Sequence, residues 1–131
     1  MKKAEKIIVF ILTALSLLML NSCGGEEVLT YEQITAQEAK NIMDSDVDYI
    51  IIDARTEEEF AEGHIKDAIL IPEYEISHRA EKELPEKDAL ILVYCRSGRR
   101  SKIASDELIK LGYSNVKEFG GIIDWPYEIV R

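Results

Sequence analysis

The chain has 131 residues, with 16 basic and 25 acidic side chains and a formal net charge of −9 at pH 7. This length is enough for one domain with a single core and too short for two. The acidic balance argues against nucleic acid as a partner, because the neutralisation of phosphates by Lys and Arg supplies much of the affinity in such complexes.

The N-terminal segment has the layout of a secretory signal. Three lysines among the first six residues precede an apolar run over residues 7–20. This run is shorter than the ~20 residues that a membrane span needs. It ends in the sequence Leu-Asn-Ser-Cys-Gly-Gly over residues 20–25, which resembles the bacterial lipobox, where cleavage before the cysteine leaves it acylated. The resemblance implies a lipid on Cys23.

We therefore predict three parts: a lipoprotein signal peptide over residues 1–22, a short linker over 23–29 and one domain over 30–131. Removal of the signal takes away three lysines and one glutamate, which makes the net charge about −11. The mature protein is expected outside the cytoplasm, as a monomer that reaches the cell-envelope membrane through its N-terminal lipid only. A plain signal peptide that leaves Cys23 free, or an uncleaved anchor, is the alternative.

After residue 30, apolar runs of strand length alternate with helical patterns. The predicted strands are 31–34, 49–52, 69–71, 90–94 and 116–119. The predicted helices begin after the capping boxes Thr35–Glu38 and Thr56–Glu59 and cover 75–84 and 101–111, the last with Ile103, Ala104, Leu108 and Leu111 facing inward. This alternation predicts the α/β class, with a mainly parallel central sheet covered by helices on both faces and a ligand site at the carboxyl ends of the strands.

The most informative motif follows the fourth predicted strand and reads Cys-Arg-Ser-Gly-Arg-Arg over residues 95–100. A thiol at the end of a strand, followed by a loop whose amides converge at a helix N-terminus, is an anion cradle with a nucleophile at its base. If Cys23 is acylated, Cys95 has no disulfide partner in the chain. A buried structural cysteine is the alternative, although a Gly- and Arg-rich loop is a poor place to bury a thiol without partners.

This loop resembles the active-site loop of the rhodanese family of sulfurtransferases, which has a cysteine, four variable residues and commonly an arginine. Further matches follow in the family's order over about residues 30 to 127: 51–55 with the acidic run after it, Gly63-His64-Ile65, 68–72 and 120–125. The pair Lys66-Asp67 departs from the family, which usually has glycine at the second position, and Asp tolerates the left-handed conformation that such a turn needs.

The resemblance implies the rhodanese fold and a sulfurtransferase that works through a persulfide on Cys95. A small anionic sulfur donor such as thiosulfate would be held by the loop residues Arg96, Ser97, Gly98, Arg99 and Arg100, and an external thiol or thiol protein would take the sulfur. Asp53 and Arg55 would support the loop, with a surface ion pair as the alternative. No cofactor is implied, and no group of His, Cys and carboxylates has metal-ligand spacing, so we predict no metal.

Three rival functions remain open at this point. Certain phosphatases share the rhodanese topology, but they have five residues between cysteine and arginine, whereas Cys95 and Arg100 are separated by four. A non-catalytic binding module is the second rival, and a redox sensor in which Cys95 is oxidised is the third. His64 is predicted to be structural rather than a general base, because a thiolate held by amides and arginines needs none.

Overall fold

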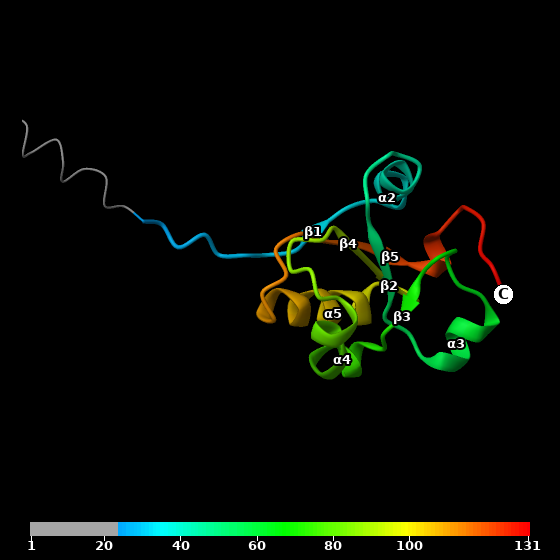
Figure 1. Ribbon diagram of the computed structural model, residues 1–131. Helices are drawn as coiled ribbons and strands as arrows, with labels where there is room; N and C mark the ends of the chain where they lie inside the picture. The colour runs from blue at the N-terminus through cyan, green and yellow to red at the C-terminus, as the bar shows by residue number, and fades with distance from the viewer. Residues whose placement is uncertain (1–23) are drawn as a thin grey trace, which may run out of the picture.

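The computed structural model describes residues 24–131 (Figure 1). The predicted signal peptide over residues 1–22 and the predicted lipidation site Cys23 lie outside the described residues. Residues 24–30 form neither helix nor strand, and their side chains are exposed. Within residues 24–131, no helix is long and apolar enough to cross a membrane.

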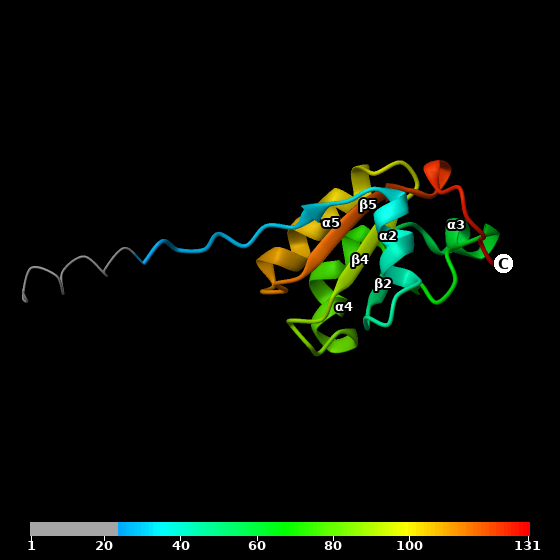
Figure 2. The ribbon, with the colours of Figure 1, turned by 90° about the horizontal axis from the view of Figure 1, so that it is seen from above.

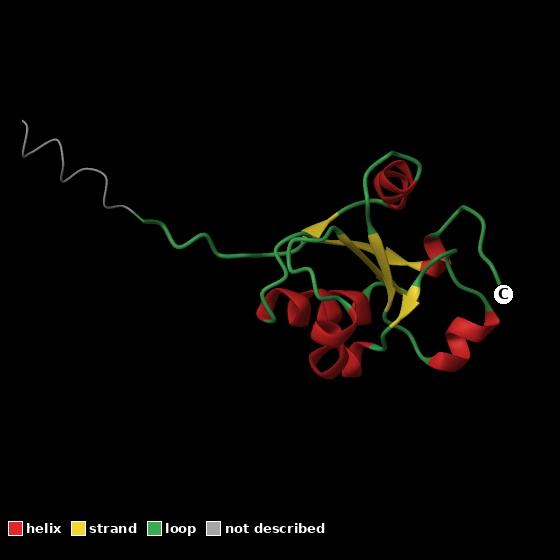
Figure 3. Ribbon diagram, viewed as in Figure 1, coloured by secondary structure: helices red, strands yellow, loops and turns green. Residues whose placement is uncertain are grey.

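The described part alternates strands and helices in the predicted order (Figure 3). The strands are β1 (Glu32–Gln33), β2 (Ile50–Asp53), β3 (Ile69–Leu70), β4 (Ile91–Cys95) and β5 (Val116–Gly121). The helices are α2 (Ala36–Met43), α3 (Glu57–Glu62), α4 (Ile76–Glu83) and α5 (Arg99–Lys110), with short 3-10 helices η2 (Glu73–Glu75) and η3 (Ile122–Asp124).

The strands form one sheet in the order β1-β5-β4-β2-β3, and all four neighbouring pairs are parallel. The prediction of a mainly parallel sheet is therefore confirmed. The apolar strand β4 lies at the centre, between β2 and β5. Its register with β5 pairs Val93 with Glu118 and then shifts, so that Cys95 pairs with Gly121. This irregularity lies directly at the end of β4, where the cysteine motif begins.

Helices cover both faces of the sheet, as predicted. α4 and α5 lie on one face and α2 on the other, together with the segment after η3 (Figures 1 and 2). Side chains along β4 alternate between the two faces. Val93 and Cys95 belong to the core beneath α4 and α5, whereas Leu92 and Tyr94 belong to the core beneath α2.

Both predicted capping boxes are present. Thr35 Oγ1 accepts a hydrogen bond from the N–H of Glu38, and the Glu38 carboxylate accepts one from the N–H of Thr35, at 3.1 and 2.7 Å. Thr56 and Glu59 make the same pair of bonds at the start of α3. These bonds satisfy donors that have no partner within the helix, which explains why both helices begin where the sequence predicts.

The inward face of α5 differs from the prediction. The helix begins at Arg99, two residues earlier than predicted, and Ile103 is 39% exposed instead of facing inward. The positions that face the sheet are Ala104 and Leu108, together with two buried serines, Ser101 and Ser105. Their hydroxyl groups find acceptors inside the protein, so small polar side chains occupy a face that a hydropathy pattern assigns to apolar ones.

Candidate active site

Cys95 is the last residue of β4, and its sulfur is enclosed by the loop that follows. The N–H of Gly98 donates to Cys95 Sγ at 3.0 Å, and the residue is only 1% exposed. Gly98 has a φ of 105°, a left-handed conformation that favours glycine, and α5 begins at the next residue. The thiol is therefore buried, but with hydrogen-bond partners, and it lies at the N-terminus of a twelve-residue helix.

The loop is held in place by the end of β5. A Cβ atom on Gly121 would lie 2.0 Å from the backbone oxygen of Arg96 and 2.6 Å from the Cα of Ser97, so only glycine fits there. The N–H of Ile123 donates to the same Arg96 oxygen at 3.2 Å. Gly121, within the sequence match over 120–125, thus allows two backbone segments to approach each other closely. The spacing of the motif does not reveal this role.

Two further residues of the site, Ser101 and Glu118, are not predicted from the sequence. The Cys95 thiol donates to Ser101 Oγ at 3.3 Å, and Ser101 Oγ donates to Glu118 Oε1 at 2.6 Å. Glu118 lies on β5 and is 3% exposed. A helical pattern that starts at Ser101 and a strand that reads Val-Lys-Glu-Phe give no sign that these two side chains meet.

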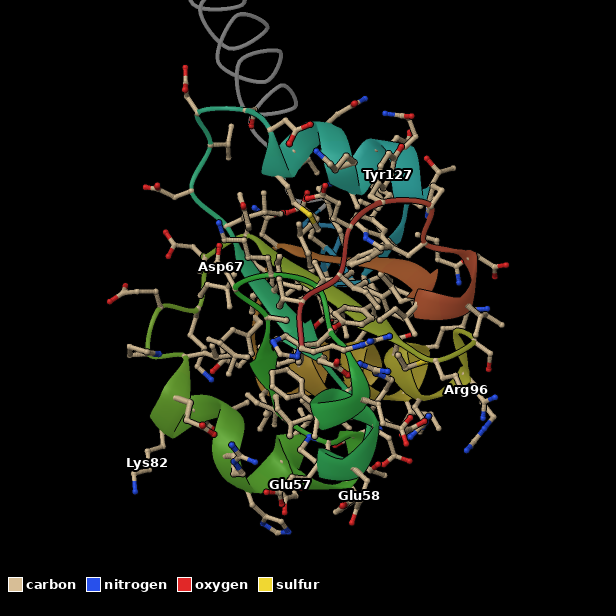
Figure 4. All side chains as sticks on the ribbon, turned by 90° about the vertical axis from the view of Figure 1, so that its right-hand side faces the viewer. Glu57, Glu58, Asp67, Lys82, Arg96 and Tyr127 are labelled. Carbon is tan, nitrogen blue, oxygen red and sulfur yellow. The ribbon has the colours of Figure 1, made fainter. Side chains whose placement is uncertain are left out.

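The three predicted anion-binding arginines differ in their surroundings. Arg96 and Arg99 are exposed and form no ion pair within the described part of the chain, and Arg96 extends away from the body of the domain (Figure 4). Arg100 instead forms a bidentate pair with the Glu59 carboxylate, at 2.7 and 2.8 Å. This guanidinium lowers the pKa of Glu59 to about 2. Ser97, between Arg96 and Gly98, is exposed.

Asp53 and Arg55 form a buried ion pair, not a surface one. Arg55 binds both carboxylate oxygens of Asp53, with a shortest distance of 2.7 Å, and also donates to the backbone oxygen of Gly63. The Tyr94 hydroxyl donates to Asp53 at 2.6 Å. Burial and the Asp53 carboxylate raise the pKa of this hydroxyl well above its usual value. The pair therefore contacts the residue directly before Cys95.

His64 packs in the turn after α3. Its ring stacks on Phe60 at 3.7 Å, and Nδ1 donates to the backbone oxygen of Phe60 at 3.0 Å. Its backbone forms an antiparallel bridge with Val130. Among residues 24–131, no three His, Cys, Asp or Glu side chains gather in a way that could hold a metal ion.

A cavity of about 740 Å³ lies away from the cysteine loop. Its lining includes Lys40 of α2 and Trp125 and Tyr127 of the C-terminal segment, and none of the residues 95–101. Tyr127 lies beside α2 (Figure 4), where its hydroxyl donates to Gln37 at 2.7 Å. The Cys95 thiol and this cavity therefore lie in different parts of the domain.

Known proteins resemble this chain in both sequence and structure. A family model described as a rhodanese-like domain matches residues 35–126. The chain is 37% identical over 73 residues to the thiosulfate sulfurtransferase PspE of Escherichia coli, covering 56% of this chain and 70% of that protein. It is 43% identical over 79 residues to a sulfurtransferase of Allochromatium vinosum, covering 60% and 72%. A solved rhodanese with anions from E. coli matches with a TM-score of 0.61 and 33% identity, over 64% of this chain and 99% of that one.

Proposed function

Because this chain belongs to the rhodanese-like domain family, we propose that it is a sulfurtransferase that carries sulfane sulfur as a persulfide on Cys95. The observation that carries this proposal is the position of the sulfur: it lies at the end of the central strand and at the N-terminus of α5, on the N–H of Gly98. Two relatives at 37% and 43% identity are named as sulfurtransferases, which supports the same chemistry.

The first half-reaction loads the sulfur. The Cys95 thiolate attacks the outer sulfur of thiosulfate, a new S–S bond forms, and the S–S bond of thiosulfate breaks so that sulfite leaves with the electron pair. The negative charge passes to the terminal sulfur of the persulfide. Arg96 and Arg99 have no competing carboxylate among the described ion pairs, so they are available to the anions. Arg100 must first exchange its Glu59 partner.

The second half-reaction transfers the sulfur from Cys95 to an acceptor. A thiophilic acceptor attacks the terminal sulfur, the persulfide S–S bond breaks, and Cys95 leaves as the thiolate. Within residues 24–131 Cys95 is the one cysteine and is free, so the acceptor comes from outside this domain. A cellular thiol or a thiol protein fits that role, and cyanide serves as a simple acceptor in an assay.

The N-terminal sequence supports a second part of the proposal, which concerns location. We propose that residues 1–22 direct export, that Cys23 receives the lipid, and that the domain from residue 30 works as a monomer outside the cytoplasm at the envelope membrane. In cells, the Cys23→Ala variant is expected to lose labelling by a fatty-acid analogue and to lose the detergent phase in phase partitioning. Equal labelling of wild type and variant would contradict lipidation at Cys23.

Mass spectrometry after thiosulfate treatment tests the sulfur chemistry. The wild type is expected to gain one sulfur atom at Cys95 and to transfer it to cyanide, and Cys95→Ser is expected to lose about a thousandfold or more of this turnover while it remains folded. A gain of oxygen alone would support a redox sensor, and no change would support a binding module. Aryl-phosphate hydrolysis that disappears in Cys95→Ser, with no sulfur transfer, would support a phosphatase.

A further inference from the structure

A buried carboxylate lies one hydroxyl group away from the nucleophile. Glu118 Oε1 accepts hydrogen bonds from Ser101 Oγ at 2.6 Å and from the N–H of Gly120 at 2.8 Å. Both donors are neutral, and no Lys, Arg or His within the described residues forms an ion pair with Glu118. Neither half-reaction of sulfur transfer uses the Glu118 side chain, although it is only 3% exposed and lies beneath the loop that follows Cys95.

The surroundings of Ser101 fix the direction of the hydrogen bonds. Its hydroxyl oxygen lies 3.0 Å from the backbone oxygen of Gly98, 3.4 Å from that of Gly120 and 2.6 Å from Glu118 Oε1, all of which are acceptors. The single hydroxyl proton therefore points at an acceptor, and the shortest of these contacts is the carboxylate. Toward Cys95 the hydroxyl presents a lone pair, which accepts from the S–H group at 3.3 Å.

These contacts form a continuous path from thiol to hydroxyl to carboxylate, which we call the Cys95–Ser101–Glu118 relay. A thiolate and a carboxylate that are both buried this close together repel each other, so ionising both is costly. If the proton instead moves along the relay, the site keeps a single negative charge throughout.

We propose that Cys95 and Glu118 share one proton through Ser101, so that Cys95 becomes a thiolate by passing its proton to Glu118 instead of to water. In this step the S–H bond breaks as Ser101 gains a proton, and the original Ser101 O–H bond breaks as Glu118 gains one, with no change in oxidation state. Glu118 acts through Ser101 and is a positioning residue. Its use during sulfur transfer rests on the proposed function, because the proton would stay on Glu118 while Cys95 carries the persulfide.

Other charged groups surround the relay and must be kept constant in a test. Arg100 on α5 lies near Cys95 and is paired with Glu59 on α3. The charge of Glu73 in η2 also raises the pKa of Arg100. Arg96 and Arg99 belong to the loop itself. None of these five residues is changed in the variants below, so a difference between variants reports on the relay.

The experiment is the rate of alkylation of Cys95 by iodoacetamide as a function of pH, read at the Cys95 peptide of the full chain by mass spectrometry. Two groups that share a proton titrate in two steps. On a logarithmic rate scale the wild type is therefore expected to show a first rise, a plateau and a second rise. The plateau is the range in which Glu118 holds the proton for part of the time.

Two variants change different members of the relay. Glu118→Gln keeps the shape and the acceptor for Gly120 but removes the charge, so it is expected to give one step, about one pH unit or more below the upper step of the wild type. Ser101→Ala removes the hydroxyl that bonds both groups and leaves the Glu118 carboxylate, so it is expected to change the height of the plateau relative to the wild type. Asp106→Asn removes an exposed carboxylate from the same helix and is expected to follow the wild type.

The outcomes separate this inference from the proposed function, since alkylation needs no sulfur donor. Superimposable profiles for the wild type and Glu118→Gln, with unchanged thermal unfolding, would overturn the shared proton. A two-step profile in a protein that gains no sulfur from thiosulfate would support the shared proton and count against the sulfurtransferase.

Discussion

Tyr94 and Cys95 are neighbours in the central strand, yet each lies against a different kind of buried carboxylate. Tyr94 donates to Asp53, whose charge is matched by the guanidinium of Arg55. Cys95 reaches Glu118, whose partners are a hydroxyl and a backbone N–H, both neutral. A buried carboxylate beside a guanidinium has its charge balanced inside the protein, whereas one held by neutral donors does not. The Asp53 side of β4 thus holds a balanced ion pair, and the Glu118 side holds an acid without a cation among the described ion pairs.

Breaking the cation–carboxylate pair should have the largest effect on stability. Arg55→Met leaves the Asp53 carboxylate buried without its cation, and we expect a loss of about 3–5 kcal/mol in the free energy of unfolding. Urea titration at neutral pH measures it. Glu118→Gln, which keeps its hydrogen-bonding shape, should cost no more than about 1 kcal/mol.

Arg79→Met is the matched control for this experiment, because Arg79 pairs with two glutamates on the exposed side of α4. It should cost clearly less than Arg55→Met. If Arg55→Met and Glu118→Gln destabilised the protein equally, the distinction between the two sides of β4 would be lost.

A second variant should disturb the Glu118 side alone. Gly121→Ala places a Cβ atom 2.0 Å from the Arg96 oxygen, so the loop has to move. We expect a loss of about 1–3 kcal/mol in stability, together with an altered pH profile of Cys95 alkylation. Gly112→Ala is the control, because it strains a left-handed residue with open space around it and lies at the far end of α5. That control should lose stability without a change in the alkylation profile, and an unchanged profile in Gly121→Ala would count against the packing role of Gly121.

The smallest effect is expected for a carboxylate that has a cation but is only partly buried. The Arg100 pair lowers the pKa of Glu59 from 4.5 to about 2. A lowered folded-state pKa stabilises the protein above about pH 4.5, and this contribution is lost as the pH falls toward 2. Glu59→Gln should therefore cost about 1 kcal/mol at neutral pH and almost nothing near pH 2.

Glu58→Gln serves as the control for that pH dependence, since Glu58 is exposed on the same helix and points away from the domain (Figure 4). Chemical denaturation at several pH values compares the two variants. A difference between wild type and Glu59→Gln that does not shrink on acidification would show that the ion pair is not its source.

Much of the fold can be predicted from local signals. The two capping boxes fix the starts of α2 and α3 because their bonds join residues three apart in the sequence. The left-handed turn at Asp67 is local in the same way, and the residue has a φ of 67°. Cys95 stands out because a thiol followed by glycine and arginines after an apolar strand is an uncommon combination.

Other parts of the site depend on which strands are neighbours, and the sequence does not show this. Glu118 enters the site because β5 pairs with β4 in a register that places it opposite Val93. Viewed along its own strand, it is one charged residue beside Lys117. The apolarity of Ile103 predicts an inward position, but Ser101 and Ser105 face the sheet instead. The Ser101 hydroxyl donates to Glu118 on β5, and the Ser105 hydroxyl donates to the Ser101 backbone oxygen within α5.

The alternation of Tyr94 and Cys95 along β4 also bears on how the chain finds its fold. A slip of β4 by one residue would turn the phenol toward Ser101 and the thiol toward Asp53. Asp53 would then lose the hydroxyl of Tyr94, and Ser101 would lose the thiol of Cys95. A buried polar group that loses a partner is penalised. The hydrogen bonds of Tyr94 and Cys95 therefore favour the same alignment of the central strand from both faces of the sheet at once.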